Sequence, residues 1–122
     1  MRLIVLFLPL FLYSSTLQIS LISDTFKQSI TQLIDKPYYL YKSEKIYANR
    51  AGILALKLGY LDICEVTHEE LERWYDHFPK EHQEKKIKSY LLKSDLSILV
   101  TKKNKKRYYL LAKTKFVNNI IK

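Results

Sequence analysis

A chain of 122 residues with 48% hydrophobic residues, two glycines and three prolines is long enough for one ordered domain, which excludes an intrinsically disordered protein. The single cysteine, Cys64, excludes an internal disulfide and is predicted to be a small buried hydrophobic residue. The net charge is +9 and uneven: residues 63–84 sum to −5 and residues 85–122 to +11. This asymmetry favours an acidic partner, either nucleic acid or an anionic membrane surface, unless it reflects only a lysine-rich composition.

The N-terminus begins with a basic residue and an apolar run, Arg2 and then Leu3–Tyr13. This pattern is typical of a secretory signal, and continuation through residue 22 approaches the length of a membrane helix. Residues 1–22 are therefore interpreted as a hydrophobic N-terminal segment. The lysines that follow it place the folded part in the cytoplasm by the positive-inside rule, whereas a cleaved signal predicts secretion. The end of a longer hydrophobic segment, or a helix packed on a second copy, are further alternatives.

Three elements are expected next. The apolar spacing in Asp24–Asp35 predicts an amphipathic helix capped by Ser23 or Asp24. A tyrosine-rich hairpin is then predicted, with strands on both sides of the polar turn Lys42–Lys45. Asn49 is expected to cap a helix that ends at Gly59.

The second half shows helix signals followed by a basic hairpin. Thr67 and Glu70 form a capping box that predicts a helix through Trp74. Pro79 is expected to open another helix, running through Tyr90. The predicted hairpin has strands over 96–101 and 107–117 and a polar turn over 102–106, with Tyr109 and Leu111 on one face and Tyr108, Leu110 and Ala112 on the other.

The order of these segments over residues 23–117 resembles a PAS domain. The segments that carry it are the lead-in helix, Ile46–Asn49 with the Asn-capped helix, Gly59-Tyr60, the Glu-Glu-Leu helix, the His77–His82 turn and the final hairpin. The resemblance implies an α+β fold over residues 23–122, an antiparallel sheet with helices packed on one side. It also implies a sensory or docking role and dimer contacts through the lead-in helix. A PAS sheet has five strands, and only four are predicted here, which suggests a truncated member with an exposed edge.

No catalytic or metal-binding pattern is expected. The spacings of His68, His77 and His82 do not place two ligands on one helix face. His82 matches the helix that carries the haem ligand in some PAS relatives, but it is predicted to be solvated among charges. Cys64 lacks the neighbours of a flavin-adduct cysteine, so neither haem nor flavin is expected. No nucleophile–base motif or phosphate loop is found, so the chain is not predicted to be an enzyme.

The predicted function is a sensory or protein-interaction module in signal transduction, as a homodimer or with a partner signalling protein. One alternative is a small basic nucleic-acid-binding protein, although nucleic acid is not the favoured partner. The other is a secreted or membrane-anchored protein of unknown role. Alternation predicts a ligand pocket lined by Tyr39, Tyr41, Leu54, Leu58, Trp74, Ile98, Val100 and Tyr109. Anion contacts are expected from Lys102, Lys103, Lys105, Lys106 and Arg107, with Tyr108 and Tyr109 available for base stacking.

Overall fold

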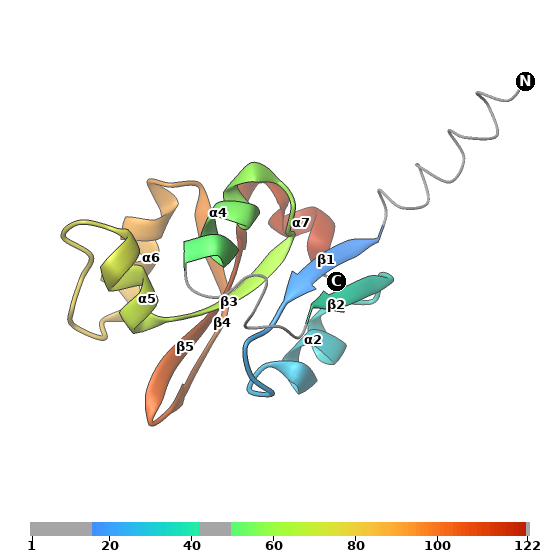
Figure 1. The fold of residues 1–122 in the computed structure, drawn as a ribbon, viewed down its shortest axis with the longest axis horizontal. Coiled ribbons are helices and arrows are strands. Elements are labelled where there is room, and N and C mark those ends of the chain that lie inside the picture. Colours follow the sequence, from blue (N-terminus) through green and yellow to red (C-terminus); the bar gives the residue numbers. More distant parts are fainter. Residues whose placement is uncertain (1–15, 42–49, 122) are drawn as a thin grey trace, which may run out of the picture.

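The computed structural model describes residues 16–41 and 50–121 of the chain, and the fold is α+β, as predicted. Five strands form one sheet in the order β2-β1-β3-β5-β4 (Figure 1). The strands are β1 (Leu17–Ser20), β2 (Tyr38–Tyr41), β3 (Ile63–Thr67), β4 (Leu96–Asn104) and β5 (Lys106–Lys113). The helices are α2 (Lys27–Leu33), α4 (Arg50–Leu58), α5 (His68–Trp74), α6 (Glu84–Leu92) and α7 (Val117–Ile120), with a 3₁₀ turn at Thr114–Phe116.

The sheet is mixed, which corrects the expected antiparallel sheet. Strand β1 pairs in parallel with both β2 and β3, whereas β5 is antiparallel to β3 and β4. A parallel pair needs a crossover connection, and α2 supplies it between β1 and β2. The second half of the predicted tyrosine-rich hairpin, with Asn49, lies outside the described residues.

Two of the described strands, β1 and β3, were not among the four predicted from the sequence. Residues 17–20 were assigned to the hydrophobic N-terminal segment but lie within the sheet, between β2 and β3. Their side chains are mostly buried. The apolar residues of this stretch therefore belong to the core of the domain, not to the N-terminal segment. A fragment that begins at Ser23 would lack this strand. The predicted helix in the first part of the segment lies outside the described residues.

Helices cover both faces of the sheet, which corrects the expectation of helices on one side. One hydrophobic cluster joins α4, α5 and α6 to the sheet, and we call this side the α4–α6 face. The other joins α2 and α7 to the opposite side, the α2–α7 face. Tyr109 and Leu111 lie in the first cluster and Tyr108, Leu110 and Ala112 in or against the second, so the alternation predicted for β5 is confirmed.

Some helix ends, but not all, lie at the capping residues predicted from the sequence. Gly59 ends α4 with φ 88°, a backbone conformation that glycine adopts without strain. Thr67 accepts a hydrogen bond from the amide of Glu70 at 3.2 Å and caps α5, as predicted. Helix α2 begins after Phe26 without a side-chain cap, because Ser23 bonds elsewhere. Helix α6 begins at Glu84, not at Pro79 as predicted.

The β4–β5 hairpin is longer and its turn tighter than predicted. Asn104 pairs with Lys106, which leaves only Lys105 in the turn, at φ 65°. A register shift between Ile98 and Val100 makes a β-bulge. The extra residue sends Val100 to the α2–α7 face, whereas Ile98 packs on the α4–α6 face.

The loop from β1 to α2 is fastened by a buried carboxylate on β3. Glu65, 1% exposed, accepts hydrogen bonds from the amides of Ile22 and Ser23 at 3.3 and 3.4 Å and from the hydroxyl of Ser23 at 2.6 Å. Burial raises the pKa of Glu65, against the opposing effect of the hydrogen bonds from Ser23 and Ile22. This carboxylate is saturated by the chain around it.

Candidate functional site

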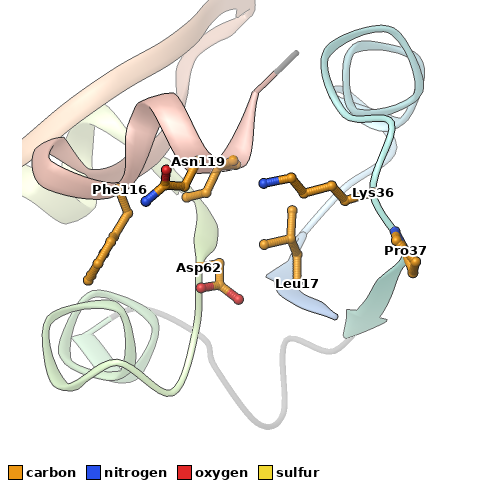
Figure 2. Close-up of a pocket in the computed structure, with 7 residues that line it drawn as sticks. Leu17, Lys36, Pro37, Asp62, Phe116 and Asn119 are labelled. Carbon is orange, nitrogen blue, oxygen red and sulfur yellow. The ribbon is translucent and has the colours of Figure 1, made fainter. Parts of the chain in front are cut away.

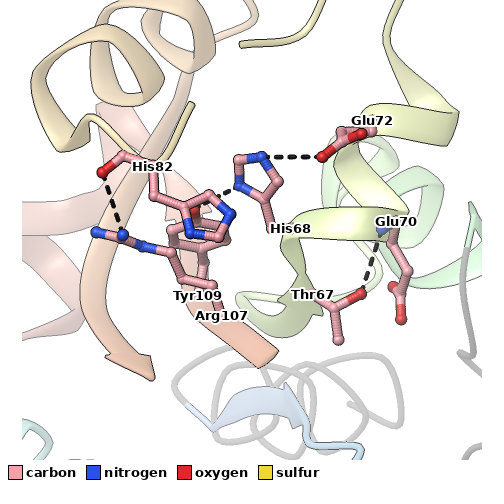
Figure 3. A network of polar contacts seen from close by, with 7 residues as sticks. All are labelled: Thr67, His68, Glu70, Glu72, His82, Arg107 and Tyr109. Atoms are coloured by element: carbon pink, nitrogen blue, oxygen red, sulfur yellow. Dashed lines mark hydrogen bonds and ion pairs between the residues drawn. The ribbon is translucent and has the colours of Figure 1, made fainter. Parts of the chain in front are cut away.

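A buried histidine stands at the centre of a polar network on the α4–α6 face. His68 is the first residue of α5 and is 3% exposed. Its Nδ1 lies 2.7 Å from the hydroxyl of Tyr109 on β5, and its Nε2 lies 3.1 Å from Oε1 of Glu72, one helical turn further along (Figure 3). The position of His68 on the first turn of α5 thus places one imidazole between a buried phenol and a carboxylate.

A second histidine and an arginine extend this network to the surface. The ring of His82, which precedes α6, contacts the ring of His68 at a centroid distance of 4.6 Å. Arg107 on β5 donates from Nη1 to the carbonyl oxygen of His82 at 3.1 Å (Figure 3). This bond ties the segment before α6 to the hairpin, so α5, that segment and β5 converge on one place.

A hollow of about 120 Å³ opens at this convergence. It is lined by Thr67, His68, Glu69, Glu72, His82, Lys105, Lys106 and Arg107. Three cations thus surround it with two carboxylates, one of which, Glu69, lies 4.0 Å from Nζ of Lys106. Pockets for drug-sized ligands measure roughly 300–1,000 Å³, so this hollow suits one small anionic group.

The ionisation of the network follows from burial. Burial lowers the pKa of His68 and the positive charge of a protonated His82 lowers it further, while Glu72 acts in the opposite direction. Burial also raises the pKa of Tyr109 to about 12. At neutral pH the phenol therefore keeps its proton and the neutral form of His68 is favoured.

The structure does not bring the eight residues of the predicted ligand pocket together. Leu54 and Leu58 are on the outer side of α4, 47% and 62% exposed, and Tyr39 is 58% exposed on the edge strand β2. Val100 is on the other face of the sheet because of the bulge. Only four of the eight pack in or against one cluster: Tyr41, Trp74, Ile98 and Tyr109. They are core residues there.

The hairpin cations divide into two groups. Lys105, Lys106 and Arg107 line the hollow, while Lys102 and Lys103 lie on β4 and do not. The expected stacking pair is not presented by the described hairpin, because Tyr109 is fully buried and Tyr108 is partly buried against the α2–α7 cluster. Single-stranded nucleic acid would therefore find charge here without an exposed aromatic platform.

A second hollow, of about 440 Å³, lies at the amino ends of β1 and β2 beside α7 (Figure 2). Its apolar lining comes from Leu17, Pro37, Phe116 and Ile120. The polar groups of its lining come from Lys36, Asp62 and Asn119. One oxygen of Asp62 already accepts a hydrogen bond from the amide of Gln18 at 2.7 Å, so this carboxylate is partly committed to the sheet.

Other predicted residues are placed as follows. Cys64 is buried, as predicted, and burial raises the pKa of its thiol well above the usual range. Asn49 lies outside the described residues, so its capping role stays a prediction. Within residues 16–41 and 50–121, no three His, Cys, Asp or Glu side chains are gathered in a way that could hold a metal ion.

Sequence reasoning missed the pairing of His68 with His82. The two are fourteen residues apart and meet only because the segment between α5 and α6 folds back, which no spacing rule for one helix detects. No sequence signal marked that pairing, but the charge contrast between residues 63–84 and 85–122 could have indicated that α5 lies beside the basic hairpin, since acidic and basic segments attract each other.

Comparison with known proteins adds no relative: no family model matches the chain, and no match is found among curated proteins or solved structures. In the part of the chain that the structure describes, none of the helices has the length and apolar character to span a membrane.

Proposed function

We propose that this chain is an interaction module in signal transduction that binds an anionic group of a partner protein, phosphoryl or carboxylate, at the hollow between α5 and the β4–β5 hairpin. The observation that carries the proposal is the convergence of Lys105, Lys106 and Arg107 with two histidines around a hollow the size of one such group. The charge-assisted hydrogen bonds that these side chains can donate to an anion are the stronger kind.

The proposal keeps the docking role that the resemblance to PAS domains implies, although the parallel pairing of β1 with β2 and β3 differs from the sheet expected from it. It assigns no catalysis to the site. Dimer formation through α2 and association with a membrane stay predictions.

Nucleic-acid binding is the second candidate, favoured by the cations along the hairpin from Lys102 to Arg107, of which Lys103, Lys105 and Lys106 are exposed. Two observations count against it as the main function. Tyr109 is fully buried and Tyr108 partly buried, and acidic side chains lie among the cations, as the contact of Lys106 with Glu69 shows. The phosphates of a nucleic acid would be repelled by these carboxylates as well as attracted by the lysines.

The test uses inorganic phosphate as the probe, titrated into the labelled full-length protein and followed by NMR. We expect saturable shifts of the backbone amides of His68, His82 and Arg107. The paired substitution K105Q/K106Q should weaken binding about tenfold or more, because it removes two charges from the lining.

The matched control is K102Q/K103Q, which changes the net charge by the same amount but outside the lining. It should leave phosphate affinity within about twofold, as expected for screened charges. Equal weakening by both pairs would contradict a defined site. In that case, tight binding of duplex or single-stranded oligonucleotides at physiological salt would favour the second candidate.

A further inference from the structure

We infer that an anion entering the hollow brings a proton from solvent onto Nδ1 of His68, so that partner binding is coupled to pH. The inference rests on the proposed function, since it concerns how the same site responds when it is filled.

The partners of His68 indicate which nitrogen is free to take the proton. Oε1 of Glu72 lies 3.1 Å from Nε2 in a geometry that does not complete a hydrogen bond, but a carboxylate can only accept, so its negative charge favours the neutral imidazole with its hydrogen on Nε2. Nδ1 then accepts a hydrogen bond from the hydroxyl of Tyr109 at 2.7 Å (Figure 3). The second proton can therefore go only to Nδ1.

The network can hold this proton without moving its heavy atoms. A tyrosine hydroxyl both donates and accepts, so rotation of the O–H bond of Tyr109 turns its oxygen toward a protonated Nδ1. The imidazolium would then lie between the oxygen of Tyr109 and the carboxylate of Glu72. Both protonation states thus keep the hydrogen bond between Nδ1 and Tyr109, which is the property that a two-state switch needs.

Without a bound anion, the surrounding charges oppose protonation of His68. The ionisable groups that face His68 come from α5, from the segment before α6, from the turn and from β5: Glu69, Glu72, His82, Lys105, Lys106, Arg107 and Tyr109. Cations outnumber carboxylates among them, and His68 is almost fully buried. An anion in the hollow would offset the cations and favour a charged imidazole.

Sodium sulfate is the probe for the test, because it stays divalent throughout the pH range used, whereas phosphate itself titrates near neutral pH. Titration calorimetry of the full-length protein at pH 7, in two buffers of different ionisation enthalpy, measures the protons taken up. We expect between about half a proton and one proton per sulfate, and roughly tenfold tighter binding at pH 6 than at pH 8. Chloride at matched ionic strength controls for screening.

Two measurements locate the proton. The His68→Gln variant should bind sulfate without proton uptake. Because this buried position is sensitive, NMR titration of the His68 ring in the unmodified protein provides the same information, and its midpoint should move to higher pH when sulfate is present. Sulfate binding without proton uptake, or uptake with an unmoved His68 midpoint, would overturn the inference and leave the proposed function standing. Absence of binding by both sulfate and phosphate would overturn the proposed function itself.

Discussion

Glu65 and His68 are three residues apart and equally buried, yet they occupy opposite kinds of environment. Glu65 lies opposite Leu110 in the pairing of β3 with β5. Its carboxylate accepts hydrogen bonds from Ile22 and Ser23 of the same chain. His68 lies at the end of the same strand, and its neighbours His82 and Arg107 lead to a hollow that is open to solvent. The comparison shows that burial of an ionisable group does not by itself indicate function. What distinguishes the two is whether a partner can reach the group.

The largest expected loss of stability follows from replacing Glu65, the group enclosed by its own chain. Replacement Glu65→Ala leaves the amides of Ile22 and Ser23 without acceptors and should lower the free energy of unfolding by about 3 kcal/mol. Chemical denaturation of the variant and the unmodified protein measures the loss. Glu81→Ala, which removes an exposed carboxylate paired only with Lys86, should change stability by less than about 0.5 kcal/mol. Similar losses in both would show that Glu65 does not hold the β1–α2 loop.

The two groups should give stability curves of opposite slope. The pKa of Glu65 is raised above its usual 4.5, so its contribution is full below that pH and is lost as pH rises through the folded-state pKa. The pKa of His68 is lowered below 6.5, so its contribution is present above pH 6.5 and is lost as pH falls through the folded-state pKa. A difference of one pKa unit between the folded and unfolded states changes the free energy of unfolding by about 1.4 kcal/mol.

Denaturation of the unmodified protein, Glu65→Gln and His68→Gln from pH 4 to pH 8 tests these signs. The stability advantage of the unmodified protein over Glu65→Gln should shrink as pH rises. Its advantage over His68→Gln should grow up to about pH 6.5 and then level off. Slopes of the same sign for both variants would contradict the distinction.

The smallest expected effect concerns the cap that holds His68 in place. Thr67→Ala removes the acceptor for the amide of Glu70 and should cost about 1 kcal/mol of stability. Thr67→Ser keeps a hydroxyl and should recover most of that loss, as measured by the same denaturation experiment. If phosphate binding also weakens in Thr67→Ala but not in Thr67→Ser, the start of α5 positions the site. Unchanged stability in Thr67→Ala would mean that the cap contributes nothing.

Local signals in the sequence determined the elements that need only neighbours along the chain. Apolar spacing predicted α2 and α4, the capping box predicted α5, and alternation correctly divided the side chains of β5 between two faces. Gly59 was correctly predicted as a helix end, and the anion contacts expected from Lys102–Arg107 stay a prediction. Each of these depends on contacts within about four residues, or on the two-residue period of a strand.

Only the tertiary structure decided the rest. The parallel pairing of β1 joins segments more than twenty residues apart, so the apolar run could not reveal that residues 17–20 belong to the sheet. One extra residue near Ile98 moved Val100 to the other face, and the same kind of long-range folding brought His82 onto His68. The candidate site lies where an acidic helix meets a basic hairpin. The sequence determined both charges, but the meeting depends on the packing of α5 and the β4–β5 hairpin on one sheet.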